Sequence, residues 1–128
     1  MNYIDLNNVK TISRGDDARM LKYLNQFNIL IPERIVQLQK ALEEQDRLKI
    51  RQILHQMSPQ IQFFGLLRVS SQIQRLELKY VSITYEDLKA QVNQIITILK
   101  KSLAEVSQSI DTIVINQAND KPDSMSNY

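Results

Sequence analysis

The sequence predicts an all-α fold, an up-down antiparallel four-helix bundle with a short extra helix at the N-terminus. Only two glycines and three prolines occur among the 128 residues, so few positions favour turns. Long stretches between them repeat apolar side chains about every 3.6 residues, the spacing of an amphipathic helix and not of a strand. We expect one bundle over residues 1–116 and a disordered polar tail over residues 117–128.

Two helices are predicted in the first third of the chain. The first spans residues 4–12, and Asp5 is a candidate cap for its start. The second begins at Asp16 or Asp17, because either carboxylate can accept the unpaired amides of a first helical turn. Pro32 lies within its apolar stripe and lacks an amide hydrogen, so we expect a kink or a brief break there.

Three further helices are predicted after these. Asp46 is a suitable start for the third, and Gly65 is a suitable end because glycine readily adopts the left-handed conformation that terminates helices. The short connection at Gly65 places the fourth helix, residues 66–78, antiparallel to the third. Ser82 or Thr84 begins a fifth helix, which continues for about thirty residues.

Composition argues against several classes of function. The formal net charge is +2, with 16 basic and 14 acidic side chains mixed along the chain, so nucleic acid is not an expected partner. One histidine and no cysteine make a poor donor set for zinc. Neither a Gly-x-Ser-x-Gly elbow nor a phosphate-binding glycine loop occurs, so a hydrolytic enzyme has little support.

Targeting signals are also missing from the sequence. It contains no signal peptide, no lipidation motif and no apolar run long enough to span a membrane. We therefore expect a cytoplasmic protein without membrane insertion.

The candidate functional residue is His55, the only histidine in the chain. At 100° per residue, the apolar side chains of the third predicted helix lie opposite His55, so the ring is expected to face solvent. A neutral imidazole is a nucleophile that can carry a phosphoryl group. An ordinary surface histidine would show the same pattern, and helical spacing alone does not distinguish the two interpretations.

With its neighbours, His55 resembles the motif of the histidine-containing phosphotransfer (HPt) domains of bacterial multistep phosphorelays. That family typically has Lys and Gly at the third and fourth positions after the histidine and a second Gly ten residues after it, and here His55 and Gly65 match. The resemblance covers about residues 3–115. Further segments that resemble the family are Tyr3-Ile4-Asp5-Leu6, Gly15-Asp16, Asp46 and Leu76-Glu77.

Two positions depart from the family pattern, since Ser58 stands in place of Lys and Pro59 in place of Gly. A serine offers a phosphorylated ring a hydrogen bond but no positive charge. Arg51, one turn before His55, and Arg68, just after the predicted end of the helix, are candidates for the missing cation. Pro59 cannot donate to the carbonyl of His55, so we expect the helix to bend there while leaving room beside the ring.

Other side chains on the same side of the helix complete the predicted site. Gln62 lies two turns beyond His55 and about 20° from its direction, which makes it the best-placed amide to bind a phosphoryl group. Gln52 is less well placed. Candidates for an apolar surface on which a partner docks are Leu48, Phe63 and Leu66.

The resemblance implies a phosphoryl carrier and not an enzyme. A receiver-domain aspartate would pass its phosphoryl group to His55, which would pass it on to a response regulator; a hybrid sensor histidine kinase would be the upstream partner. The catalytic groups and Mg²⁺ would belong to the receiver domain, so this chain would bind no cofactor. The alternative is an HPt-like interaction module that binds a receiver or another signalling protein without accepting phosphate, and Ser58 and Pro59 favour this alternative.

Overall fold

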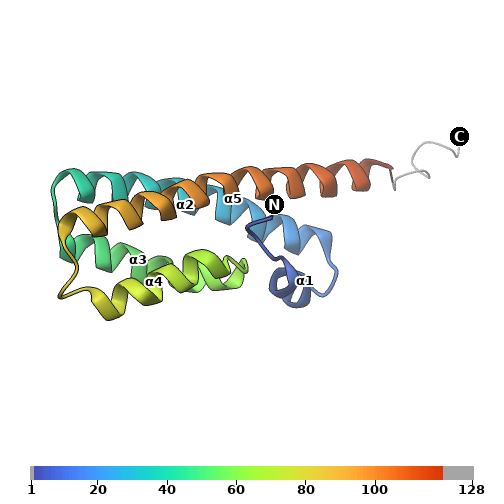
Figure 1. Ribbon diagram of the computed structural model, residues 1–128. Helices are drawn as coiled ribbons and strands as arrows, with labels where there is room; N and C mark the ends of the chain where they lie inside the picture. The colour runs from blue at the N-terminus through green and yellow to red at the C-terminus, as the bar shows by residue number, and fades with distance from the viewer. Residues whose placement is uncertain (1, 120–128) are drawn as a thin grey trace, which may run out of the picture.

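The computed structural model describes residues 2–119, and every regular element within that range is an α-helix. The predicted all-α class is therefore confirmed. The five helices, labelled in Figure 1, are α1 (Asn7–Ser13), α2 (Asp17–Glu43), α3 (Arg47–Phe63), α4 (Leu67–Lys79) and α5 (Tyr85–Asn119).

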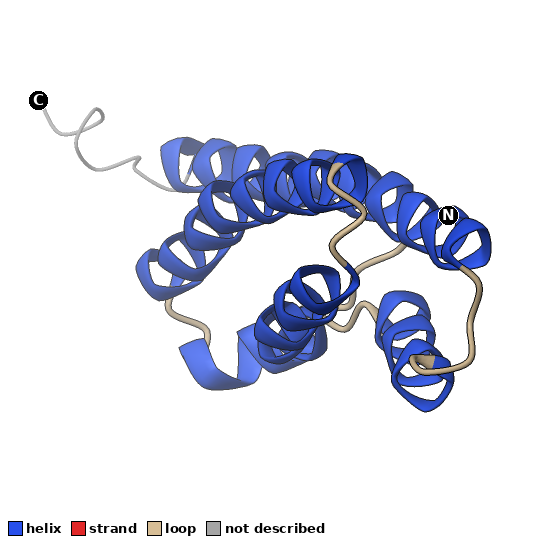
Figure 2. Cartoon of the chain, turned by 90° about the vertical axis from the view of Figure 1, so that its left-hand side faces the viewer, coloured by secondary structure: helices blue, strands red, loops and turns tan. Residues whose placement is uncertain are grey.

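All five helices contribute side chains to one hydrophobic core. Helix α2 packs against α3 and α5, and α4 also packs against α3 and α5, whereas α1 packs against α2. In Figure 1 the pair α2 and α5 lies above the pair α3 and α4, and Figure 2 shows that short loops join the helices. The rings of Phe27 and Phe64 meet in the interior with their centroids 4.3 Å apart. Other fully buried side chains include Leu24, Leu38, Ile53, Met57, Ile95 and Leu99.

Three predicted helix starts are confirmed by side-chain hydrogen bonds. The Asp16 carboxylate accepts two amides of the first turn of α2, at 2.9 and 3.4 Å. The Asp46 carboxylate accepts the amide three residues further on at 3.0 Å, and the Thr84 hydroxyl accepts the amide in the same relative position at 3.1 Å. Each bond satisfies a donor that has no partner within its own helix.

The first helix begins later than predicted. Residues 2–6 lie outside any helix, and α1 starts at Asn7, so the predicted start at residue 4 is wrong. The physical reason is that this segment bonds to other parts of the chain: the Asp5 amide donates to the carbonyl of Phe64 at 2.9 Å. The Asp5 carboxylate still accepts the Asn7 amide at 2.9 Å, but from a position before the helix. We call residues 2–6 the N-terminal strap.

Neither internal proline ends its helix. Helix α2 continues through Pro32, so the predicted alternative of a brief break is wrong, and α3 continues through Pro59. Ile31 and Ile35, on either side of Pro32, are both buried, and their burial keeps the two halves of α2 in the same core despite one missing hydrogen bond.

The last helix is longer than predicted. Residues 117–119, assigned from the sequence to a disordered tail, belong to α5 in the structure. The remainder of the predicted tail, residues 120–128, lies outside the described residues.

Side-chain bonds tie together one end of the bundle, where α2, α3 and α5 meet. The Tyr85 hydroxyl donates to the carbonyl of Leu42, and burial raises the pKa of the Tyr85 phenol, with the nearby charge of Glu86 raising it further. The phenol therefore remains a donor throughout the neutral pH range. Arg47 donates to two carbonyl oxygens of the α4–α5 connection, at 2.9 and 2.7 Å.

The N-terminal strap crosses the opposite end, over the turn between α3 and α4. Gly65 in that turn has φ +64°, which confirms the predicted left-handed ending of α3. A Cβ atom on Gly65 would lie 2.5 Å from the Cβ of Asp5 and 2.6 Å from its carbonyl oxygen. The strap is also held from α5, because the Glu105 carboxylate accepts the amide of Tyr3 at 2.9 and 2.8 Å.

Replacing Gly65 by alanine should destabilise the fold more than the same change at Gly15. Both glycines have positive φ, but no atom lies within 4 Å of the Cβ position at Gly15. We expect Gly15→Ala to lower the free energy of unfolding by about 1 kcal/mol and Gly65→Ala by about 3 kcal/mol, since only the latter adds a steric overlap. Urea denaturation of both variants measures the difference, and equal losses would show that the strap does not press on the turn.

Candidate functional site

His55 projects from α3 into solvent, as predicted. The opposite face of α3 is buried against the neighbouring helices, and at 100° per residue this burial turns the histidine outward. The His55 side chain forms no hydrogen bond or ion pair with any residue in the described range 2–119. The buried side chains of α3 are Ile50, Ile53, Leu54, Met57 and Ile61.

An open depression of about 260 Å³ lies beside the imidazole. Helix α3 contributes Leu48, Arg51, Gln52 and His55 to its lining, and α4 contributes Glu77. The depression thus combines a nucleophile (His55), a cation (Arg51), an anion (Glu77), an amide (Gln52) and an apolar side chain (Leu48). This set can contact a charged group on the ring and an apolar group on a partner.

Arg51 is held next to this depression by two contacts, one with Glu77 of α4 and one with Tyr80 just after that helix. Its Nε and Nη2 atoms each lie 3.1 Å from the same carboxylate oxygen of Glu77. Its guanidinium carbon lies 4.7 Å from the ring centroid of Tyr80, a cation–π contact. Because the Arg51 and Glu77 side chains are 47% and 33% exposed, water screens the ion pair and its contribution to stability is at most about 1 kcal/mol. The pair can therefore rearrange at little cost.

Ser58 and Gln62, the two uncharged polar groups predicted to support a phosphoryl group, do not line the depression. Ser58 is half-buried and Gln62 is exposed further along α3. Gln52, ranked lower from the sequence, lines the depression with His55. Gln62 was predicted from its angle around the helix axis, which is close to that of His55. Gln52 is nearer to His55 along the axis, only one turn away, and this explains why it lines the depression and Gln62 does not.

The structure does not bring Arg68 together with His55. Arg68 lines a different groove, between α4 and α5, where its guanidinium carbon lies 5.5 Å from the ring centroid of Tyr3. Tyr3 belongs to the N-terminal strap, and the sequence pattern did not predict where the strap runs. Of the two predicted cations, only Arg51 lies at the histidine.

The three predicted docking residues differ in their exposure. Leu48 is 57% exposed and lines the depression, so its side chain is available to a partner. Leu66 is 1% exposed and belongs to the core, so its prediction as a docking residue is wrong. Phe63 is half-buried, with its ring 5.4 Å from Tyr23 and 5.6 Å from Phe64 between centroids. The apolar repeat continues through Phe63, the last residue of α3, to Leu66 beyond it, which explains why these two side chains turn toward the interior.

Helix geometry alone did not identify Glu77 as part of the site. A signal was nevertheless present, because Arg51 and Glu77 are equally far from Phe64 at the turn between two antiparallel helices, and such positions face each other. Pro59 is exposed on α3 and Gly65 lies in the turn that follows this helix, and neither lines the depression at His55.

Comparison of the chain with protein-family models, curated proteins and solved structures finds no match. Within residues 2–119, no three His, Asp or Glu side chains form a group that could hold a metal ion. In the same range, no helix is both long enough and apolar enough to cross a lipid bilayer.

An exposed His55 should react with diethyl pyrocarbonate about as fast as N-acetylhistidine does. A ring nitrogen is the nucleophile that attacks a carbonyl carbon of the reagent, so the rate reports how accessible the imidazole is. The absorbance of carbethoxyhistidine should report one modified residue per chain, and His55→Gln should give none. A rate more than about tenfold below that of N-acetylhistidine would show that neighbouring side chains shield the ring.

Proposed function

We propose that this chain is a phosphoryl carrier of the HPt type, in which His55 accepts a phosphoryl group from a receiver-domain aspartate and passes it to a response regulator. The observation that carries the proposal is a single imidazole that faces solvent from a helix of an all-α core. A carrier must present its nucleophile to two partners in turn, and this placement meets that requirement.

The packing supports an up-down antiparallel four-helix bundle with α1 as a short extra helix, the architecture that the resemblance to HPt domains implies. Successive helices from α2 to α5 reverse direction along the long axis in Figure 1. Each of the four contacts two others, in the order α2, α3, α4, α5 and back to α2. In this arrangement the His55 face of α3 is accessible from outside the bundle.

The transfer requires only a nucleophile from this chain. The lone pair of the outer ring nitrogen, Nε2, attacks phosphorus as the P–O bond of the aspartyl phosphate breaks, and the carboxylate leaves with the bonding electrons. The reverse reaction delivers the phosphoryl group to the next aspartate. Mg²⁺ and a lysine of the receiver would stabilise the charge on the transferring oxygens, so the carrier would not itself be an enzyme.

Arg51 is our candidate for the cation that this chain contributes. It lies one turn before His55 on the same side of α3, and its Glu77 partner is also in the depression. A phosphoryl group on His55 carries more negative charge than Glu77, so Arg51 is expected to move from the carboxylate toward the phosphoryl oxygens. Arg51 would then supply the positive charge that a lysine provides in the HPt motif, where this sequence has Ser58.

The implied partners are a response-regulator receiver domain and a hybrid sensor histidine kinase, which places the reaction in the cytoplasm. Leu48 supplies exposed apolar surface beside the ring for receiver docking. The interface would be small, as suits a transient encounter.

Phosphotransfer to His55 is tested with a phosphorylated receiver domain and Mg²⁺. Acid-labile phosphate should appear on the wild-type chain and be absent from His55→Gln, because no other histidine is present. The control variant is Gln56→Ala, which alters the exposed residue next to His55 and should accept phosphate normally. Label that persists on His55→Gln would refute the assignment.

The contribution of Arg51 is tested by charge removal. Arg51→Gln should slow transfer by about tenfold, the usual scale for losing one charge-assisted contact to the transferring group, and Arg51→Lys should recover part of the rate. The matched control is Arg75→Gln on α4, outside the depression, which should leave the rate unchanged. Rapid-quench measurement of the transfer rate distinguishes these variants, and equal rates for Arg51→Gln and the wild type would exclude this role.

The second candidate function is an HPt-like interaction module that binds a receiver or another signalling protein without accepting phosphate. Ser58 and Pro59 favour it, because they replace the lysine and glycine that typify the HPt motif. It predicts receiver binding that His55→Ala leaves intact and no phosphohistidine with any donor. Phosphate on His55 would exclude it.

A further inference from the structure

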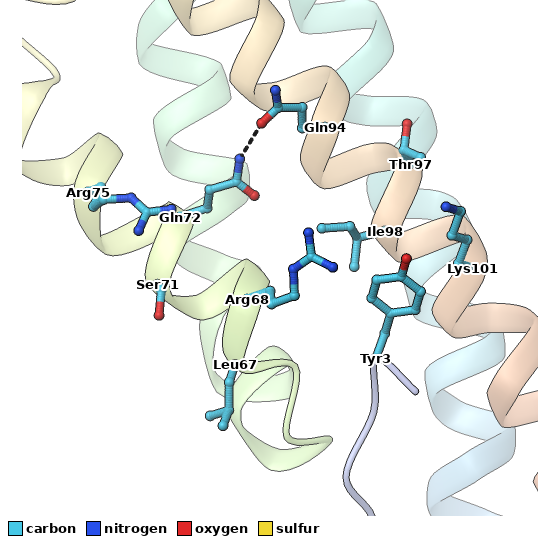
Figure 3. A pocket seen from close by; sticks show the side chains of 10 residues that line it. All are labelled: Tyr3, Leu67, Arg68, Ser71, Gln72, Arg75, Gln94, Thr97, Ile98 and Lys101. Atoms are coloured by element: carbon cyan, nitrogen blue, oxygen red, sulfur yellow. Dashed lines mark hydrogen bonds between the residues drawn. The ribbon is translucent and has the colours of Figure 1, made fainter. Parts of the chain in front are cut away.

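A second, larger groove lies between α4 and α5, and the N-terminal strap contributes Tyr3 to it (Figure 3). Its volume is about 640 Å³, within the range of sites that hold small molecules. The depression beside His55 involves α3 and α4, so the two features are on different sides of α4. The groove is lined by Tyr3, Leu67, Arg68, Ser71, Gln72, Arg75, Gln94, Thr97, Ile98 and Lys101.

All the charged side chains that line this groove are positive. Arg68 and Arg75 lie two turns apart on α4, and Lys101 lines the groove from α5. Among the lining residues in the described range, none is Asp or Glu. Glu105, one turn beyond Lys101, already accepts the amides of the strap, including that of Tyr3. Three like charges in one groove repel one another, and a bound anion would relieve that repulsion.

Tyr3 brings the cations of the two helices toward each other. The Arg68 guanidinium carbon lies 5.5 Å from its ring centroid, and the Lys101 Nζ lies 5.6 Å from the same centroid. Figure 3 shows the ring at the end of the strap, between the Arg68 and Lys101 side chains. Arg68 and Lys101 are therefore positioned by a contact within the protein before any ligand arrives.

The groove also contains ordered amide groups. Gln72 is 8% exposed, and its side-chain Nε2 donates to the side-chain oxygen of Gln94 at 2.8 Å, as the dashed line in Figure 3 shows. This bond fixes the orientation of both amides across the two helices. This amide pair, of which Gln72 is buried and Gln94 exposed, supplies directional hydrogen bonds in addition to the charge of the three cations.

We propose that this groove binds a small phosphorylated molecule. Arg68, Arg75 and Lys101 supply the positive charge that attracts its phosphate, and Tyr3 and Ile98 supply apolar surface for its organic part. A phosphate group near neutral pH carries more charge than a single carboxylate, which matches three cations better. Guanidinium groups can also bind two phosphate oxygens at once. This inference stands independently of the proposed phosphotransfer at His55.

Inorganic pyrophosphate is the probe for this groove, titrated into the intact chain and followed by calorimetry and by NMR of backbone and side-chain amides. Saturable binding should shift the side-chain amide signals of Gln72 and Gln94. Arg75→Gln and Lys101→Gln should each weaken binding by about tenfold, whereas Lys100→Gln, the adjacent lysine outside the groove, should change it less than twofold. His55→Gln should bind as the wild type does.

Four results would overturn the proposal. The first is no saturable binding at millimolar pyrophosphate. The second is an equal effect of Lys100→Gln and Lys101→Gln, which would indicate a diffuse attraction of the whole surface. The third is equal affinity for pyrophosphate and for citrate, which would indicate recognition of negative charge without preference for phosphate. Loss of pyrophosphate binding in His55→Gln would place the anion at the histidine instead and would also contradict it.

Discussion

Burial of one face of α3 is the constraint on which the rest of this structure depends. Ile53, Met57 and Ile61 form part of a row that contacts the surrounding helices, and the rigid geometry of a helix then fixes where every other side chain of α3 points. His55 is exposed because those neighbours are buried. The same constraint keeps α3 continuous through Pro59, since a break would remove part of the row from the core.

Helix α4 separates two chemically different surfaces. On the side of α3, the positive charge of Arg51 is matched by Glu77 in a solvent-screened pair. On the side of α5, the lining residues that the structure describes carry positive charge without a carboxylate among them. The first arrangement agrees with our proposal that Arg51 changes partners when His55 is phosphorylated, and the second with our proposal that the groove binds an anion. One short helix thus serves two sites whose charges are balanced in different ways.

Local sequence signals predicted most of the helical architecture. Asp16, Asp46 and Gly65 mark helix ends through chemistry that depends only on nearby residues, so they were identified without knowledge of the fold. The exposure of His55 followed from periodicity for the same reason. The contacts that were missed join distant parts of the chain: the strap over Gly65, the Arg51–Glu77 pair and the position of Arg68 beside Tyr3. Leu66 was misplaced because an apolar residue after a helix can face either the core or solvent until the next helix is positioned.

The hydrogen bonds between Tyr3 of the N-terminal strap and Glu105 of α5 have a consequence for the order of folding. Tyr3 and Glu105 are separated by 102 residues, so closing this contact restricts nearly the whole chain at once. Contacts between adjacent helices close much shorter loops and are entropically cheaper to form first. We therefore expect the groove that Tyr3 completes to form after the bundle, so that a partly folded chain would lack it.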